Sequence, residues 1–137
     1  MKVLIGTKNE GKIRKYSEML KELNIEYCTL KDFDINFEVD EVGETVEENS
    51  KIKAREYYKA FDMPVIVDDS GLELDNLSPD MQPGVYVRRY KGRELTDEEI
   101  IKLYSKEIEK VGGKTTGAFN IAITIINEKR RWTHKIN

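Results

Sequence analysis

Apolar side chains recur along the chain at two spacings, one typical of strands and one typical of helices. Residues 1–7 form a short apolar run that polar residues and a glycine close, which predicts a buried strand. A helix is expected next, because an apolar face at helical spacing follows Lys12 and consists of Ile13, Tyr16, Leu20 and Leu23. Residues 25–30 then predict a second strand.

The middle of the chain predicts a second helix and a third strand. Residues 32–43 are acidic, and their pattern indicates an extended segment without a clear role. Thr45 and Glu48 fit a capping box, in which each side chain accepts a hydrogen bond from the other residue's backbone N–H, so a helix should run from there to about Ala60. The apolar run Val65–Val67 predicts the next strand, and we expect a loop after it, up to Gly84.

The last third of the chain predicts a helix and a hairpin. A second capping box at Thr96 and Glu99 begins a helix that Gly112-Gly113 should end. Residues 115–126 are β-branched and apolar enough for a long strand, and residues 130–137 are expected to pair back on it. Strands alternate with helices early in the chain, so the sequence predicts an α/β fold with a central mixed β-sheet flanked by helices.

Composition narrows the class of protein. The chain has 137 residues, enough for one domain with a core, so we expect a single domain over residues 1–137. A net charge of −3 provides no basic surface for nucleic acid. No apolar stretch has the length of a membrane span, and the single cysteine, Cys28, has no internal disulfide partner and is expected to be a strand thiol. These features favour a cytoplasmic protein with a small ligand.

The turn between the first strand and the first helix is one candidate site. Residues 6–12, GTKNEGK, contain two glycines and two lysines. Backbone N–H groups at a helix N-terminus bind phosphate, and Lys12 would neutralise its charge, although a glycine turn with solvated lysines explains the same residues. The stretch also satisfies GxxxxGK, the body of a P-loop. Ile13 stands where a P-loop needs Ser or Thr to bind Mg²⁺, so a P-loop-like NTPase is a less favoured alternative.

Two aspartates, Asp68 and Asp69, follow the third strand directly. Desolvating a carboxylate is costly unless it is paired or binds a metal, so the pair suggests an oxygen-ligand site for a hard cation such as Mg²⁺. Adjacent strand residues point to opposite faces, so both can serve one site only if the chain turns there, as Ser70-Gly71 would allow. The alternative to a metal site is that one aspartate caps the turn and the other is solvated. Glu48 is a possible third carboxylate, although its capping role also explains its presence.

Two further sets of residues are weaker candidates. Tyr86, Arg88, Arg89 and Tyr90 follow a Pro-Gly turn, where they would grip phosphates or stack on a base, although such residues also cover sheet edges. His134 is the only histidine, so a Ser-His-Asp triad would depend wholly on it, and we expect it on the surface of a strand.

Four ordered blocks resemble a known family. They are TKNEGK (7–12), EENSKIKA (47–54), VDDSGLELDNL (67–77) and PGVYVRRYKG (83–92), and GAFNIAI (117–123) is similar to the strand that follows them. The blocks resemble those of the Ham1-like inosine/xanthosine triphosphate pyrophosphatases (ITPases). The resemblance implies an ITPase-like (Ham1/Maf-like) α/β fold of two lobes around a long mixed sheet, and a homodimer. It also implies nucleotide-pool sanitation, by Mg²⁺-dependent hydrolysis of the deaminated purine nucleotides ITP, dITP and XTP to monophosphate and pyrophosphate.

The resemblance also implies roles for individual residues. Glu48 and Asp69 would bind the metal, Asp69 would accept the proton of the attacking water, and Asp68 would support the site. Lys53 and Ser70 would contact the substrate. The rest of the substrate-binding set is the turn, which comprises Thr7, Lys8, Asn9, Glu10, Gly11 and Lys12.

The chain departs from the family pattern at several positions. Lys15 stands where the first helix often has a glutamate, Ser50 replaces an alanine, and Val87-Arg88 replaces a Ser-Ala pair. The family also continues beyond Asn137, with a glycine-rich GFGYDP loop and a final helix that recognise the base. We therefore expect a C-terminally shortened member that carries the metal and phosphate half of the site. An inactive nucleotide- or metal-binding remnant is the alternative.

Overall fold

The structure is a computed structural model that describes residues 2–34, 37–84, 89–90, 93–127 and 131–136. The chain divides into two compact units. One unit consists of Met1–Asp69 and Ala122–Lys135, and the other of Ser70–Ile121 and Ile136–Asn137. None of the helices in the described part of the chain is long and apolar enough to cross a membrane.

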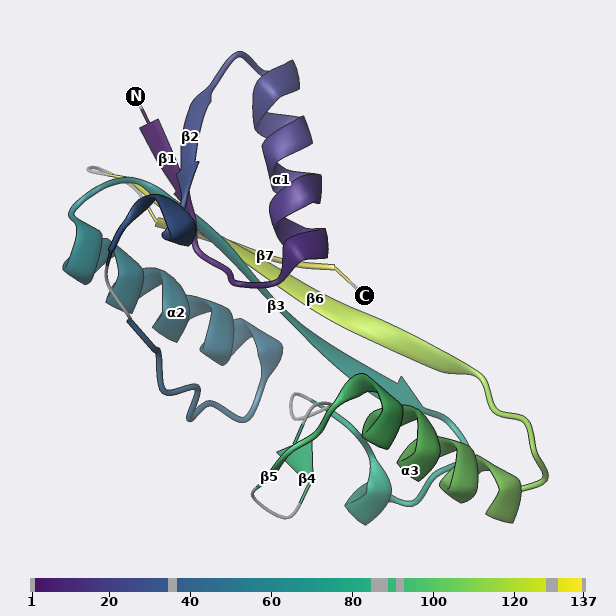
Figure 1. Cartoon of the computed structure of the whole chain (residues 1–137). Coiled ribbons are helices and arrows are strands. Elements are labelled where there is room, and N and C mark those ends of the chain that lie inside the picture. Colours follow the sequence, from purple (N-terminus) through teal and green to yellow (C-terminus); the bar gives the residue numbers. More distant parts are fainter. Residues whose placement is uncertain (1, 35–36, 85–88, 91–92, 128–130, 137) are drawn as a thin grey trace. The chain divides into compact units, whose positions relative to one another are not determined.

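Strands and helices alternate in the first half of the chain, as the apolar spacing predicts (Figure 1). β1 pairs in parallel with β2 on one side and with β3 on the other. Parallel neighbours need a long crossover between them, which the helices supply. In chain order the elements are β1 (Lys2–Ile5), α1 (Glu10–Glu22), β2 (Glu26–Thr29), the short 3-10 helix η1 (Leu30–Asp32), α2 (Val46–Phe61) and β3 (Val65–Leu74).

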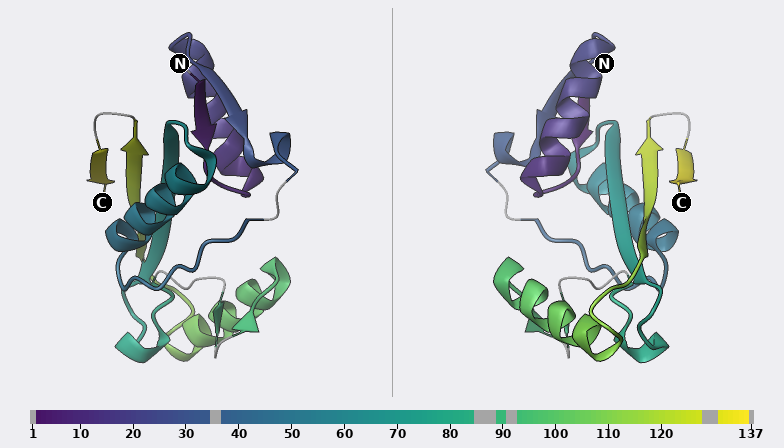
Figure 2. Two further views of the ribbon diagram at one scale, coloured as in Figure 1. Left: turned by 90° about the vertical axis from the view of Figure 1, so that its left-hand side faces the viewer. Right: turned by 90° about the vertical axis from the view of Figure 1, so that its right-hand side faces the viewer.

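One five-stranded sheet has the order β2-β1-β3-β6-β7. β6 (Gly117–Ile126) and β7 (Arg131–Ile136) run in opposite directions, as the hairpin at the yellow end of the chain in Figure 2 shows. The sheet is therefore mixed, which confirms the predicted fold class. β3 and β6 each have ten residues, and their residues are shared between the two units.

α1 and α2 cover opposite faces of β3. Ile66 packs in an apolar cluster with Tyr16 of α1, whereas Val67 packs in another cluster with Tyr57 of α2. Alternate residues of a strand face opposite sides, so each helix covers one set of side chains. The two aspartates that come next in β3 continue this alternation.

The second unit contains one long helix, α3 (Asp97–Lys110), and several short elements. The predicted capping box begins this helix, since the side chains of Thr96 and Glu99 each accept a hydrogen bond from the other residue's backbone N–H. Tyr104 of α3 packs in an apolar cluster with Leu74 of β3. The short elements are η2 (Pro79–Met81), β4 (Arg89–Tyr90) and β5 (Arg93–Glu94), the last two paired antiparallel.

β3 is longer than the sequence predicts. The expected end of the strand at Val67 is wrong, because the strand continues to Leu74. The chain therefore does not make the turn at Ser70-Gly71 that would have let both aspartates serve one site. Leu72 exchanges two backbone hydrogen bonds with Gly84, of 3.0 and 2.8 Å, and its side chain packs against the apolar cluster of the second unit. Backbone pairing and apolar burial beyond the aspartates therefore keep the chain extended where Ser-Gly alone suggests a turn.

Candidate active site

The turn after β1 is held close to β3 and α2. The Gly6 N–H donates a hydrogen bond of 2.8 Å to the carbonyl oxygen of Ile66. A Cβ atom at Gly6 would lie 2.6 Å from Cγ1 of Val67 and 2.9 Å from Cδ2 of Tyr57, a separation that side chains do not tolerate. Glycine is therefore required here by close packing, and it brings the turn next to the aspartates of β3.

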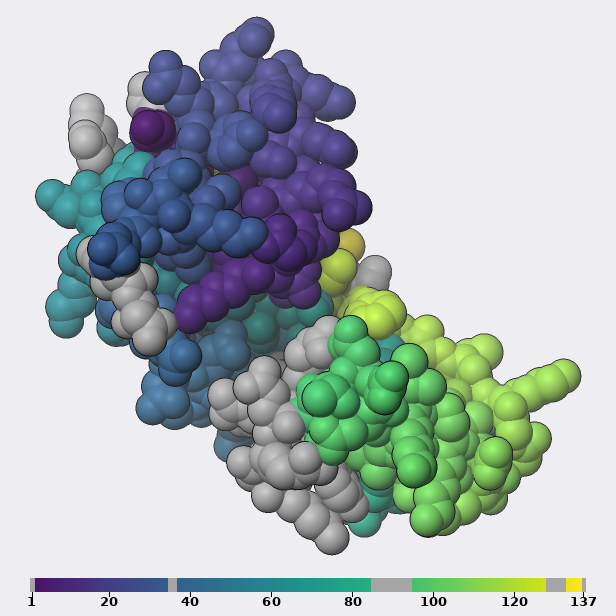
Figure 3. Space-filling model, in the orientation of Figure 1, coloured from purple at the N-terminus to yellow at the C-terminus, as the bar shows by residue number. Residues whose placement is uncertain are grey.

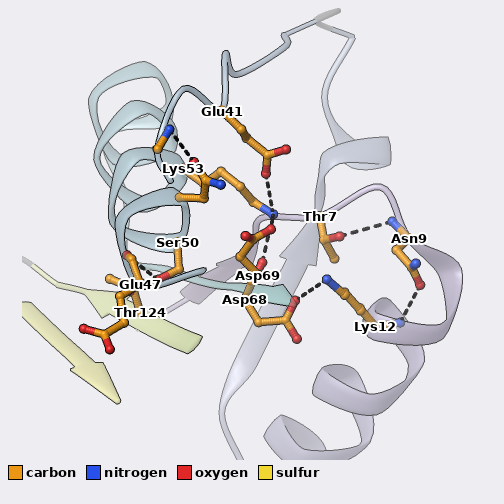
Figure 4. A network of polar contacts seen from close by, with 12 residues as sticks. Thr7, Asn9, Lys12, Glu41, Glu47, Ser50, Lys53, Asp68, Asp69 and Thr124 are labelled. Carbon is orange, nitrogen blue, oxygen red and sulfur yellow. Dashed lines mark hydrogen bonds and ion pairs between the residues drawn. The ribbon is translucent and has the colours of Figure 1, made fainter. Parts of the chain in front are cut away.

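Thr7 and Asn9 shape the turn and begin α1. The hydroxyl oxygen of Thr7 accepts a hydrogen bond of 3.2 Å from the Asn9 N–H, and Oδ1 of Asn9 accepts one of 3.1 Å from the Lys12 N–H (Figure 4). Asn9 is thus the N-cap of α1. These two side chains fix the turn and the first turn of the helix, and helix N-termini favour anions.

The rest of the turn is exposed and charged. Lys8 lies 4.0 Å from a carboxylate oxygen of Glu38, and Glu10 forms an ion pair with Lys31 of η1. In the space-filling view the purple turn reaches the surface beside the blue segment that follows β2 (Figure 3). A pocket of about 280 Å³ lies there, lined by Thr7, Lys8, Ile13, Leu30, Lys31 and Phe37.

Asp68 is buried on the α1 side of β3, with only 2% of its surface exposed. Its Oδ2 accepts a hydrogen bond of 2.7 Å from the Tyr16 hydroxyl. Its Oδ1 forms an ion pair of 2.7 Å with Nζ of Lys12 (Figure 4). A second ammonium, that of Lys15, lies 3.9 Å from Oδ2. Oδ1 of Asp68 has no hydrogen bond among the described residues, so its ion pair with Lys12 is the contact that ties it to the start of α1.

Asp69 is buried on the α2 side of the strand, where Lys53 is the nearest cation. Nζ of Lys53 lies 3.8 Å from Oδ1 of Asp69 and 3.3 Å from Oε1 of Glu41, and it donates a hydrogen bond of 2.8 Å to the Asp68 carbonyl oxygen. Oδ2 of Asp69 has no hydrogen-bond partner among the described residues. The site thus contains a buried carboxylate oxygen that has no partner among the described residues.

The environment of Asp69 shifts its ionisation toward neutral pH. Burial raises the pKa of Asp69 from 3.8 to about 6, against the lowering effect of the Lys53 charge, and the Glu41 charge raises it further. Lys12 lowers this pKa and Asp68 raises it, each by less. A carboxylate with a pKa near 6 is ionised at pH 7 but can take up a proton, as a general base must.

Glu48 begins α2 and differs from the predicted capping box. Oγ1 of Thr45 accepts a hydrogen bond from the Glu48 N–H, as predicted, but Oε2 of Glu48 accepts one of 2.9 Å from Glu44, the residue before the cap. The reciprocal half of the box is therefore wrong by one residue. Glu48 is exposed, and Glu41 rather than Glu48 is the glutamate beside Lys53 and Asp69.

The acidic segment before α2 is fixed by an asparagine. Oδ1 of Asn49, which is buried, accepts a hydrogen bond of 2.8 Å from the Gly43 N–H. A Cβ atom at Gly43 would lie 2.7 Å from that Oδ1, so the close approach requires glycine. This contact holds the segment that carries Glu41 against α2. Sequence reasoning missed both roles: the acidic character of residues 32–43 was the only signal for Glu41, and Asn49 lies in the block EENSKIKA (47–54) but was given no role.

The remaining candidates have separate places. Ser70 follows Asp69 in β3 and is half-buried, and Cys28 is buried in β2 as expected. His134 is exposed on β7, in agreement with a surface strand residue. Tyr86 and Arg88 lie outside the described residues, as do the side chains of Arg89 and Tyr90.

The donor chemistry of the site fits a hard cation such as Mg²⁺. Within residues 2–34, 37–84, 89–90, 93–127 and 131–136, no three His, Cys, Asp or Glu side chains gather as a metal cage. Magnesium, however, is usually held by one or two carboxylates together with water and substrate phosphates. The unpartnered oxygen of Asp69 supplies one such carboxylate, and Glu41 lies close to the same lysine.

Comparison with known proteins decides the family. The model of the Ham1 family matches residues 3–136. The chain belongs to the Ham1 family. It is 41% identical over 124 residues to the dITP/XTP pyrophosphatase of Bacillus licheniformis, covering 90% of this chain and 62% of that protein. It is 43% identical over 115 residues to the dITP/XTP pyrophosphatase of an Exiguobacterium species, covering 84% and 56% of the two chains. The Ham1-family chain thus spans about 60% of the length of these curated relatives.

Solved Ham1 structures share the fold. A HAM1 protein from Coxiella burnetii superposes with a TM-score of 0.80 at 27% identity, covering 98% of this chain and 69% of that one. The Staphylococcus aureus Ham1 protein gives a TM-score of 0.78 at 27% identity, with 98% and 68% coverage. The family resemblance and the α/β fold expected from the sequence are both confirmed.

Proposed function

We propose that this Ham1-family chain hydrolyses the deaminated purine nucleoside triphosphates ITP, dITP and XTP to nucleoside monophosphate and pyrophosphate, and so cleanses the nucleotide pool. The observation that carries the proposal is Asp69, a buried carboxylate with an unpartnered oxygen and a pKa raised to about 6, near the turn that begins α1. The names of the relatives, dITP/XTP pyrophosphatases, support the choice of substrate.

The triphosphate is proposed to bind at the N-terminal turn of α1. Asn9 caps this helix N-terminus, where the helix dipole favours an anion, and Lys12 adds a positive charge at the same place. Lys53 is a second cation and lies on the Asp69 side of β3. The other proposed substrate contacts are Thr7, Lys8, Glu10, Gly11 and Ser70.

Asp69 is proposed to act as the general base. A water molecule attacks the α-phosphorus, its proton passes to the Asp69 carboxylate, and the bond to the bridging oxygen breaks so that pyrophosphate leaves. At pH 7 a group with a pKa near 6 is mostly ionised and is ready to accept this proton. The positive charges of Lys12 and Lys53 stabilise the negative charge that develops on the phosphate oxygens.

Mg²⁺ is the proposed cofactor, with Asp69 and Glu48 as its protein ligands. When bound, the ion would neutralise phosphate charge and lower the pKa of the attacking water. The free oxygen of Asp69 supports its part in this site. Glu48 must release the Glu44 N–H to take part, and Glu41 is the carboxylate already beside Lys53.

Assembly, domain organisation and location are proposed from the family pattern. We infer a homodimer in the cytoplasm, and a single ITPase-like domain over residues 1–137 built from both compact units. No nucleic acid or membrane partner is expected. The net charge of −3 is consistent with a small anionic substrate met by a few local lysines rather than by a basic surface.

Product analysis tests the proposed reaction. The purified chain is incubated with Mg²⁺ and, separately, with ITP, XTP, GTP and ATP, and the products are separated by chromatography. Asp69→Asn serves as the matched inactive control. We expect monophosphate and pyrophosphate, formed fastest from ITP and XTP, and no turnover by the variant.

The products also separate the alternatives. Diphosphate and inorganic phosphate would indicate a P-loop-like NTPase, which Ile13 argues against because it has no ligand atom for the metal. Nucleotide binding without any product, in a folded sample, would indicate an inactive binding remnant. Equal turnover by Asp69→Asn would contradict the assignment of the base.

A further inference from the structure

We propose that Tyr16 is a positioning residue for the phosphate-binding ammonium of Lys12 and acts on it through the buried carboxylate of Asp68. The inference rests on the phosphate-binding role proposed for Lys12. None of the family blocks includes Tyr16, whose place in the sequence is explained by the apolar face of α1 alone.

Asp68 divides its two carboxylate oxygens between two residues of α1. The Tyr16 hydroxyl donates to Oδ2 at 2.7 Å, and the Lys12 ammonium lies 2.7 Å from Oδ1. Residues four apart on a helix lie on the same face, one turn above the other, so α1 can present both groups to one side chain of β3. The hydroxyl therefore fixes one oxygen, and the other is left to hold the ammonium.

The Tyr16 hydroxyl is fixed in place and stays protonated. The side chain is only 3% exposed and packs in an apolar cluster with Val3, Leu20 and Ile66. Burial raises the pKa of the tyrosine, and its hydrogen bond to Asp68 raises it further, so the hydroxyl remains a donor throughout the physiological range. A tyrosine with its ring fixed in this way holds Asp68 in a single orientation.

A phenylalanine at this position would fill the same space but leave Oδ2 of Asp68 without its donor. A buried carboxylate oxygen without a hydrogen-bond donor costs folding free energy, so the carboxylate of Asp68 would bind other donors instead. Two are within reach, the Lys12 ammonium itself and the Lys15 ammonium, which lies 3.9 Å from Oδ2. Lys12 would then be drawn across both oxygens and away from the phosphate.

The side chain of Lys12 is placed to serve both the carboxylate and a ligand. It is 23% exposed, whereas the side chain of Asp68 is 2% exposed, so the ammonium lies between the buried acid and the open side of the turn. A phosphate oxygen can bind this ammonium only if the ammonium contacts one oxygen of Asp68 and not both. Tyr16 keeps the second oxygen, Oδ2, occupied and so prevents the second contact.

The test compares two hydroxyl deletions in the same apolar cluster. Tyr16→Phe removes the hydroxyl that donates to Asp68. Tyr27→Phe removes a hydroxyl that does not contact Asp68, from a ring packed against the same cluster. Affinity for inorganic pyrophosphate is measured by calorimetry in Mg²⁺ buffer, alongside KM and kcat for ITP and the midpoint of thermal unfolding. For Tyr16→Phe we expect pyrophosphate affinity to fall and KM to rise by roughly threefold to tenfold, with kcat within about twofold.

A second background shows whether the effect passes through Lys12. In Lys12→Met, the Tyr16→Phe change should cause no further loss of pyrophosphate affinity, because the ammonium that Tyr16 positions is gone. Equal losses in both backgrounds, or equal losses from Tyr16→Phe and Tyr27→Phe, would overturn the inference and indicate a packing role.

The outcomes separate this inference from the proposed function. If the parent chain hydrolyses nucleotide and Tyr16→Phe has unchanged pyrophosphate affinity and KM, the proposed function stands and the positioning role is refuted. Pyrophosphate binding that weakens in Tyr16→Phe, in a chain that hydrolyses no nucleotide, supports the positioning role and refutes the enzyme. A parent chain that neither binds pyrophosphate nor hydrolyses nucleotide refutes both.

Discussion

Replacing Asp69 with asparagine should make the folded protein more stable at neutral pH while it abolishes turnover. The side chain keeps its size and loses its charge. Lys53 retains two other partners, Oε1 of Glu41 at 3.3 Å and the Asp68 carbonyl oxygen at 2.8 Å, so the substitution leaves no ammonium without a partner. The change therefore isolates the free energy of keeping the Asp69 charge buried.

The magnitude follows from the shifted ionisation. In the unfolded chain Asp69 ionises near its ordinary pKa of 3.8, and in the folded protein near 6. Between about pH 4 and pH 6 the folded protein holds a proton that the unfolded chain has lost, so the free energy of unfolding falls as the pH rises through this window. A shift of about two units corresponds to about 3 kcal/mol. For a chain of this size that is a rise of roughly 10 °C in the unfolding midpoint of the variant at pH 7.5.

The assay is urea unfolding of the parent chain and Asp69→Asn at pH 4 and pH 7.5, with EDTA present so that no divalent ion binds. Asp40→Asn, which changes an exposed aspartate, is the control for removing one negative charge. We expect Asp69→Asn to gain stability at pH 7.5 and to gain little at pH 4. A variant that is less stable than the parent chain at pH 7.5, or one whose gain is the same at both pH values, would refute this reasoning.

Two further predictions concern the charges beside Asp69 and the role of Glu48. Glu41 raises the pKa of Asp69 and Lys53 lowers it. In pH–rate profiles, the acid limb of kcat/KM should therefore move to lower pH in Glu41→Gln and to higher pH in Lys53→Met. Shifts in the same direction would contradict the charge assignment. Glu48→Gln keeps an oxygen for the Glu44 N–H, so its unfolding midpoint should be unchanged, while its Mg²⁺ requirement should rise by roughly tenfold if Glu48 is a ligand. A lower midpoint with an unchanged Mg²⁺ requirement would assign Glu48 to helix capping alone.

Local signals in the sequence predicted most of the fold. The helix starts at Thr45 and Thr96 follow from side-chain chemistry within a few residues, and the structure has α2 and α3 there. The length of β3 could not be predicted in this way. It depends on the pairing of Leu72 with Gly84 and on apolar packing in the second unit, both of which join residues distant in the sequence.

The site was predicted in its parts but not in its pairings. The turn and the two aspartates stand out as motifs, yet β3 separates the aspartates onto opposite faces. The sequence therefore could not show that Asp68 belongs with Tyr16 and Lys12, and Asp69 with Lys53 and Glu41. Glu41 was missed because its acidic segment has no periodicity, and its place depends on the contact between Gly43 and Asn49. The spacing of apolar residues places Tyr16 on the apolar face of the first helix, and tyrosine and phenylalanine fit that spacing equally well, so the pattern gives no sign of the hydroxyl's role.

The position of bond cleavage tests the central claim most directly. The chain is incubated with ITP and Mg²⁺ in water enriched in oxygen-18, and the isolated products are analysed by mass spectrometry. Attack at the α-phosphorus, with Asp69 as the base, places the label in inosine monophosphate and none in pyrophosphate. Label in pyrophosphate or in inorganic phosphate would show attack at another phosphorus and would contradict the proposed reaction.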